Sequence, residues 1–249
     1  MLSENGPIVL AFHKVMPRFS YGVTNYDPRR MHKLLSRLAD QEFSLANESV
    51  QCSRSVRVTF DDGYAHLADI VPSLMERFGF RPVVFVPTGW IGRPNRWDYS
   101  HVVHSVPHLT EHQITALHKC GVMFGSHGHS HRELIGLPDG CLREELRSSR
   151  RRLEDLTGER VTLLSYPFGR HDERVRDAAR TEGYTAAYTM KHPSAVDPPL
   201  ALGRVAVYGF DTINAVVRRM RDCRMERIEA AAAHALSGGT VLLNRLRGI

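Results

Sequence analysis

Short apolar runs alternate with helical patterns along the whole chain, and this alternation restricts the fold more than any other feature. Apolar runs rich in Val, Leu and Phe are typical of strands in a parallel sheet covered on both faces. The expected strands are Ile8–Phe12, Val56–Phe60, Pro82–Val86, Val122–Gly125, Thr162–Tyr166, Thr185–Thr189, Gly203–Val207 and Thr240–Leu243. Repeated strand–helix units over 249 residues predict an α/β fold, a distorted (β/α) barrel of about seven or eight strands. Residues 1–249 are expected to form a single domain.

Capping residues indicate where some of the intervening helices begin and end. Asp27 followed by Pro28 predicts a helix start, because Asp accepts hydrogen bonds from the free N–H groups and Pro suits the first turn. Gly158 and Gly183 each follow a helical stripe and predict helix ends.

The longest expected irregular stretch, Thr88–Thr110, contains Trp90, Trp97 and Tyr99. A loop of this length in a compact domain is often functional. These aromatic residues either cover the edge of the barrel or form a wall on which a sugar ring stacks, and the sequence leaves both interpretations open.

The composition is typical of a soluble globular protein, with 42% hydrophobic and 24% charged residues. No run of about 18 apolar residues is present, and residues 1–7 lack the basic and apolar regions of a signal peptide. The cysteines are scattered and form no C-x-x-C motif, which favours reduced thiols. We therefore expect a cytoplasmic protein without a transmembrane segment.

The chain has a net charge of +6, and arginines cluster in residues 147–152 and 218–227. Acidic residues are interleaved with both clusters, so the arginines form either a solvated helix face or a surface that attracts an anionic partner. Such a partner would be a nucleotide sugar or a phospholipid headgroup, the latter giving peripheral association with an anionic surface. No nucleic-acid-binding motif is present, and we expect no nucleic-acid partner.

Two adjacent carboxylates, Asp61 and Asp62, follow an expected strand and precede Gly63. In a (β/α) barrel, the carboxyl ends of the strands carry the active site. At a sharp turn, one carboxylate can bind a metal while the other remains free as a base. The alternative is that an aspartate here only caps the following helix.

Three histidines, His127, His129 and His131, follow another expected strand. Neutral imidazole is the commonest protein ligand for Zn²⁺, and His127 and His131 are spaced so that both can face one ion. Two histidines and one carboxylate leave coordination positions open for water and substrate. A bound metal lowers the pKa of its water towards ~7 and polarises a carbonyl group. The combination therefore predicts a metal-dependent amide or ester hydrolase.

A third polar cluster, Ser165–Gly169, follows a further expected strand. Its Pro and Gly residues predict a tight turn. The cluster is either only a turn or a means of directing a backbone N–H, such as that of Phe168, at a tetrahedral oxyanion.

Together these motifs resemble those of the polysaccharide deacetylase family, also called the NodB-homology or carbohydrate esterase family 4 fold. Thr59–Gly63 (TFDDG) matches the first family motif in full, and His127–His131 has the spacing of the second, H-[ST]-x-x-H. Ser165–Gly169 resembles the third motif, and Ala11–Val15 resembles the start of one branch. The resemblance covers residues 8–190.

The resemblance implies Asp61 as the catalytic base and Asp62, His127 and His131 as ligands of a divalent metal. Zn²⁺ is the expected metal, with Co²⁺ or Ni²⁺ as alternatives, whereas His129 has no ligand role in the family. The implied fold is a distorted (β/α)7 barrel. The implied reaction removes an N-acetyl or O-acetyl group from an amino sugar in a polysaccharide or in a lipid- or nucleotide-linked precursor.

Three positions depart from the family pattern. Gly128 replaces a Ser or Thr whose hydroxyl helps to hold the histidine loop. Ser165 stands where many members have an arginine that orients the base. Asn244 stands where the final motif has a general-acid histidine, and an amide cannot protonate a leaving amine at neutral pH.

Another histidine would therefore have to supply the proton, and we expect His13 to do so, with His129 and His171 as alternatives. Two other functions remain open from the sequence. One is a related hydrolase that acts on a formylated sugar or a small cyclic amide. The other is a non-catalytic protein that binds metal and sugar, which the loss of the general-acid histidine suggests.

Overall fold

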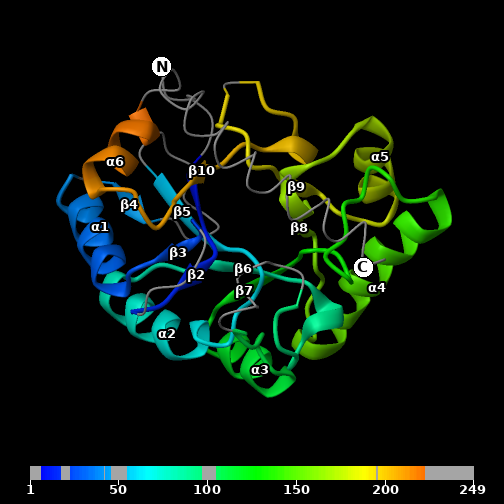
Figure 1. Cartoon of the computed structure of the whole chain (residues 1–249), viewed down its shortest axis with the longest axis horizontal. Helices are drawn as coiled ribbons and strands as arrows, with labels where there is room; N and C mark the ends of the chain where they lie inside the picture. Colours follow the sequence, from blue (N-terminus) through cyan, green and yellow to red (C-terminus); the bar gives the residue numbers. More distant parts are fainter. Residues whose placement is uncertain are drawn as a thin grey trace.

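A curled parallel sheet forms the centre of the molecule in this computed structural model, which describes residues 7–17, 23–41, 43–45, 55–96, 105–194 and 196–221. The strands follow the order β10–β1–β5–β6–β7–β8–β9, and β4 pairs with β5. Their bounds are β1 Ile8–Phe12, β4 Ser44–Leu45, β5 Ser55–Phe60, β6 Val83–Val86, β7 Met123–Ser126, β8 Leu163–Ser165, β9 Ala186–Tyr188 and β10 Val205–Ala206. Figure 1 shows the strands around the centre, with the helices outside them. The predicted parallel α/β architecture is confirmed.

One short segment, residues 202–206, closes the sheet, because it pairs with β9 at its beginning and with β1 through β10 at its end. Leu202 forms an isolated parallel bridge with Tyr188 of β9, whereas Val205 of β10 pairs with β1. Gly203 lies between them, and a Cβ atom there would come within 2.6 Å of the backbone of His192. The barrel is therefore distorted, because a single segment connects β9 to β1 where a regular barrel has full strands.

Several of the helices that cover the sheet begin or end at residues with clear capping roles. Their bounds are α1 Pro28–Asp40, α2 Leu67–Phe78, α3 Glu111–Lys119, α4 Asp139–Thr157, α5 Glu173–Thr181 and α6 Ile213–Arg221, with 3-10 turns η1 Thr88–Trp90, η3 Pro167–Gly169 and η4 Pro199–Ala201. The Asp27 side chain accepts hydrogen bonds from the backbone N–H groups of Arg29 and Arg30. Gly158 ends α4 with a φ of 72°. Both caps agree with the sequence prediction.

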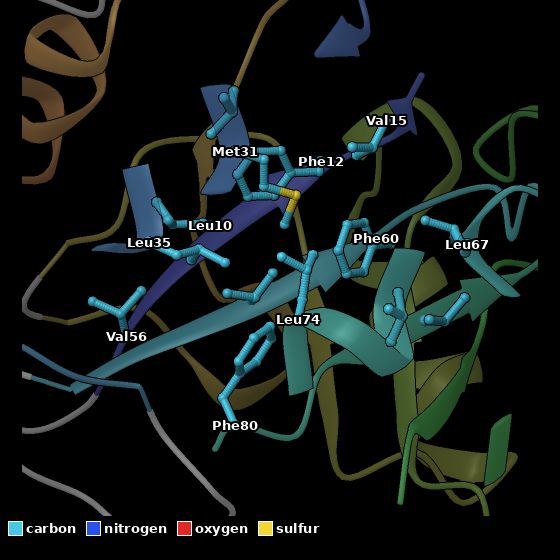
Figure 2. Packing of buried hydrophobic residues seen from close by; sticks show 14 of the residues in the cluster. Leu10, Phe12, Val15, Met31, Leu35, Val56, Phe60, Leu67, Leu74 and Phe80 are labelled. Atoms are coloured by element: carbon cyan, nitrogen blue, oxygen red, sulfur yellow. The ribbon is translucent and has the colours of Figure 1, made fainter. Parts of the chain in front are cut away.

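The main hydrophobic core lies between strands β1 and β5 and helices α1 and α2 (Figure 2). Phe12 from β1 and Phe60 from β5 pack with their ring centroids 5.9 Å apart. Leu35 of α1 and Leu74 of α2 belong to the same buried cluster. This packing fixes the carboxyl ends of β1 and β5, and those ends lead directly into the candidate site.

Several elements, most of them two-residue strands, were not predicted from the sequence. Strands β2 (Lys14–Val15) and β3 (Asn25–Tyr26) form a separate two-stranded ladder, and α3 and β4 were also missed. Two-residue strands are too short to show a periodic pattern. The expected strand Thr240–Leu243 and the residues Asn244, Trp97 and Tyr99 lie outside the described residues.

Arg147, Arg150 and Arg152 of α4 form ion pairs with neighbouring acids. Arg147 donates two hydrogen bonds to Glu182, at 3.0 and 2.8 Å, and Arg150 pairs with Glu154 one turn along the helix at 2.8 Å. These pairs support the interpretation of residues 147–152 as a solvated helix face. Association with an anionic surface stays a prediction.

Among the described helices, none combines the length and the apolar character needed to cross a membrane. Cys120 and Cys141 are free and exposed, in agreement with the predicted reduced thiols, and Cys52 and Cys223 lie outside the described residues. The cytoplasmic location and the extent of the domain over residues 1–249 stay predictions.

Candidate metal centre and catalytic face

The predicted site residues lie at the carboxyl ends of the strands. Asp61 and Asp62 follow β5, His127 follows β7, and Phe168 lies in η3 just after β8. His13 follows β1, and the backbone N–H of Asp61 donates to the carbonyl of the last β1 residue at 2.8 Å. Clusters that are distant in the sequence thus share the face on which (β/α) barrels carry their active sites.

Asp62, His127 and His131 form a compact group of potential metal ligands, with one ligand atom from each within 4.8 Å of the others. The Oδ1 atom of Asp62 is 3.5 Å from Nε2 of His127 and 3.3 Å from Nε2 of His131. Two ligands of a tetrahedral zinc ion, each about 2.0–2.1 Å from the metal, are about 3.3 Å apart. The donor types and their spacing therefore fit a zinc-like ion.

Hydrogen bonds from outside this group orient two of its members. Nδ1 of His127 is 2.7 Å from the carbonyl oxygen of Ser165, so Nδ1 carries a hydrogen and Nε2 is the nitrogen that faces Asp62. The backbone carbonyl of Asp62 accepts a hydrogen bond from Nδ1 of His108, also at 2.7 Å. These bonds select the tautomer of one ligand and hold the backbone of another.

The electrostatics of the group favour a bound cation. Burial raises the pKa of Asp62, but hydrogen bonds from His127 and His131 hold that pKa well below its usual range. Burial alone would lower the pKa of His127, but the hydrogen bond to Asp62 raises this pKa above its usual value. The pKa of His131 is lowered, because burial outweighs its bond to Asp62. An ionised carboxylate beside imidazole nitrogens is a suitable donor set for Zn²⁺.

Backbone strain is concentrated at the same place. Asp62, His131 and Phe168 have φ values of 68°, 62° and 60°, and they are the only non-glycine residues with positive φ in the described part of the chain. Such conformations cost about 1–3 kcal/mol each and persist where the surroundings determine them. The Phe168 and His131 rings also make a T-shaped contact, with centroids 4.9 Å apart.

A buried arginine binds Asp61, the other carboxylate of the pair. Nη1 and Nη2 of Arg204 donate to the two Asp61 oxygens at 2.8 and 2.7 Å. The Ser165 hydroxyl accepts from Arg204 at 2.9 Å and donates to Asp61 at 3.2 Å. Burial raises the pKa of Asp61, but Arg204 more than offsets this effect and lowers the pKa to about 2. The Asp61 carboxylate is therefore ionised and fixed in orientation.

Comparison with known protein families supports the resemblance seen in the sequence. The family described as polysaccharide deacetylase matches residues 48–187, more than half of the 249-residue chain. The chain belongs to the polysaccharide deacetylase family.

A curated relative shows partial sequence identity to this chain, and solved structures show the same fold. YxkH of Bacillus subtilis, provisionally named a polysaccharide deacetylase, is 26% identical over 151 residues, which is 61% of this chain and 50% of YxkH. The chain thus spans about half the length of this curated relative. The Streptococcus pyogenes deacetylase PplD in complex with acetate has a TM-score of 0.72 at 17% identity, covering 87% of this chain and 98% of PplD. IcaB from Ammonifex degensii has a TM-score of 0.71 at 19% identity, covering 88% and 98%. These similarities confirm the barrel fold.

The three histidines considered as general acids in this deacetylase family member have different surroundings. His13 interacts electrostatically with both Asp61 and Asp62, as expected for a residue that follows β1. His129 is exposed, and its Nδ1 is 3.0 Å from a threonine hydroxyl of η1. His171 stacks on a buried tyrosine, with ring centroids 4.8 Å apart. The surroundings therefore favour His13 among the three.

Sequence reasoning missed two residues of this candidate site, Arg204 and His108. An arginine inside the expected apolar strand Gly203–Val207 was an available signal, because a fully buried arginine needs a carboxylate partner. The arginine that many family members have at position 165 is absent, and Arg204 binds Asp61 from a different segment. His108 lies in a stretch without a periodic pattern, where the sequence offered no comparable signal.

The free energy of unfolding is expected to depend on pH through His66, which bonds to the segment that follows His13. Nε2 of His66 accepts the Val15 N–H at 2.9 Å, so protonation of Nε2 breaks this bond. Burial, together with the charge of Lys14, lowers the pKa of His66 from 6.5 to about 4. The unfolded chain takes up a proton at higher pH than the folded chain, so the free energy of unfolding falls as pH decreases from 6.5 to about 4.

The expected loss through His66 is up to about 3 kcal/mol, measured by denaturant unfolding across this pH range. The His66→Gln variant does not titrate at this position and should lose less stability over the same range. Equal losses in the variant and the wild-type protein would contradict the assignment to His66.

Proposed function

We propose that this protein is a metal-dependent deacetylase that hydrolyses the N-acetyl or O-acetyl group of an amino sugar in a polysaccharide or glycan precursor. The observation that carries this proposal is the buried Asp61 carboxylate, held by Arg204, directly beside the group formed by Asp62, His127 and His131. The two adjacent aspartates thus have different partners, which suits a base and a metal ligand. Family membership supports a carbohydrate substrate.

Asp62, His127 and His131 would hold the divalent metal. The two imidazoles favour Zn²⁺, with Co²⁺ or Ni²⁺ as alternatives. When bound, the metal supplies a Lewis acid that polarises the acyl carbonyl and lowers the pKa of a water molecule. Three protein ligands leave positions open for the substrate and for water.

The other residues transfer protons and stabilise charge. Asp61, kept ionised and oriented by Arg204, accepts the proton of the attacking water. The backbone N–H of Phe168 donates to the oxyanion that develops on the acyl oxygen. For an N-acetyl substrate, His13 gives a proton to the departing amine, a role that Asn244 cannot fill. The products are then acetate and a free amino sugar.

Acetate release from short N-acetylglucosamine oligomers tests the proposal. We expect chelated protein to release no acetate and to regain activity when Zn²⁺, Co²⁺ or Ni²⁺ is added. The His131→Gln variant should stay inactive under the same conditions, because one of the three proposed ligands is lost. Thermal unfolding of the variant would show that it remains folded at the assay temperature.

Two results would replace this proposal with another function. Formate release from a formylated sugar, without acetate release from the acetylated one, would identify a related deformylase. Metal binding without release of any acid from a panel of acetylated and formylated sugars would identify a non-catalytic protein that binds metal and sugar.

A further inference from the structure

The loop between the two histidine ligands is bonded to helix α4 through one carboxylate. Oε2 of Glu145 accepts the backbone N–H groups of His129, at 2.9 Å, and Ser130, at 2.8 Å. Oε1 of Glu145 accepts the Ser130 hydroxyl at 2.5 Å. A single side chain of α4 therefore satisfies three donors in the segment that joins His127 to His131.

The other side of this loop is bonded to η1. The carbonyl oxygens of residues 128–130 accept, in order, the Thr88 N–H at 3.2 Å, the Gly89 N–H at 2.7 Å and the Trp90 indole N–H at 3.1 Å. A Cβ atom on Gly89 would lie 2.8 Å from the His129 carbonyl oxygen, so glycine is needed for this close approach. The loop is thus held between α4 and η1.

A pair of serines attaches the beginning of the loop to the same helix. The Ser126 hydroxyl accepts the Gly128 N–H at 3.1 Å and donates to the Ser149 hydroxyl of α4 at 2.7 Å. Gly128 has a φ of 73° and lacks the hydroxyl that its family position usually provides. Side chains from outside the motif therefore make the bonds that hold the loop.

We propose that Glu145 is a positioning residue for the metal ligand His131. This inference rests on the proposed metal-dependent function. His131 has a φ of 62°, which a non-glycine residue keeps only when its surroundings determine it, and the Glu145 bonds end at the residue just before it. Without the carboxylate, residues 129–131 can relax, and the His131 imidazole moves away from Asp62.

Comparison of Glu145→Ala with Glu144→Ala tests this role. Glu144 is the adjacent, exposed residue of α4, and its carboxylate bonds to Ser148 on the same helix. We expect the amides of His129 and Ser130 to exchange with deuterium faster in metal-free Glu145→Ala than in wild type. The Kd for Zn²⁺ should increase by about 10- to 100-fold. Glu144→Ala should match the wild-type protein in both measurements.

Conservative variants separate positioning from general stability. Glu145→Gln keeps an acceptor oxygen and should recover much of the Zn²⁺ affinity. Glu145→Asp has the charge but a shorter side chain and should recover less. If a thermal melt shows that Glu145→Ala is unfolded, the comparison of Glu145→Gln with Glu145→Asp replaces it as the test.

The outcomes distinguish this inference from the function on which it rests. A wild-type protein that binds no Zn²⁺, Co²⁺ or Ni²⁺ would overturn the metal-dependent function, and the positioning role with it. A wild-type protein that binds Zn²⁺ while the folded Glu145 variants bind it equally tightly would overturn the positioning role alone. Equal weakening in Glu144→Ala would also overturn it, because the effect would then belong to α4 as a whole.

Discussion

Asp61→Asn is expected to lower kcat for acetate release by about 10²- to 10⁴-fold while metal binding is retained. Asparagine preserves the shape of the side chain but cannot accept the proton of the attacking water. The Asp61 carboxylate is bonded to Arg204 and Ser165, and it is not part of the Asp62–His127–His131 group. Its loss should therefore affect turnover far more than the Kd for Zn²⁺.

Asp62→Asn is the matched control for Asp61→Asn, because it makes the same change at the neighbouring position. It should weaken Zn²⁺ binding, since the group loses its only carboxylate. Both variants should be assayed well below their unfolding temperatures, because Asp61→Asn also leaves the buried Arg204 without an ionised partner. Full activity in Asp61→Asn would show that the base is assigned incorrectly. Loss of Zn²⁺ binding in Asp61→Asn alone would reverse the two roles.

Arg204→Met is expected to lower the free energy of unfolding by about 3–5 kcal/mol and to impair catalysis. The side chains of Arg204 and Asp61 are 0% and 2% exposed, so removal of the guanidinium leaves a carboxylate in a medium that solvates it poorly. Denaturant unfolding measures the first effect, and kcat for acetate release measures the second.

The same variant should also change the pH dependence of activity. Burial raises the pKa of Asp61, and without Arg204 this effect has no strong opposition. Asp61 then becomes protonated at higher pH than in wild type, so the acidic limb of the kcat/KM profile moves to higher pH. Arg204→Lys keeps a positive charge but loses the bidentate hydrogen bond to Asp61. The acidic limb of its kcat/KM profile should therefore lie between those of Arg204→Met and wild type.

Arg219→Met is the matched control for Arg204→Met. Arg219 forms another buried ion pair, with Asp211, and the two side chains are 3% and 2% exposed. Its loss should lower stability by a similar amount and leave the pH profile of activity in place. An unshifted profile in Arg204→Met would show that Arg204 stabilises the fold without tuning the base.

The sequence alone predicted the parallel α/β architecture and the residues that come together at the candidate metal centre. Apolar runs of strand length and helix caps such as Asp27 are local patterns, and they indicate an element whatever surrounds it. Because parallel strands place their carboxyl ends on one face, Asp62, His127 and His131 could be expected to meet without knowledge of the packing. Their motif spacing also indicated the family.

Only the tertiary structure determined which residues hold that group in place. Arg204 reaches Asp61 across the barrel, 143 positions along the chain, and Glu145 reaches the histidine loop from a separate helix. Such contacts depend on how the sheet curls and where α4 packs. A local periodic pattern in the sequence indicates neither of these features. The ligands could therefore be predicted from their motifs, whereas the residues that orient them could be recognised only after the fold brought distant segments together.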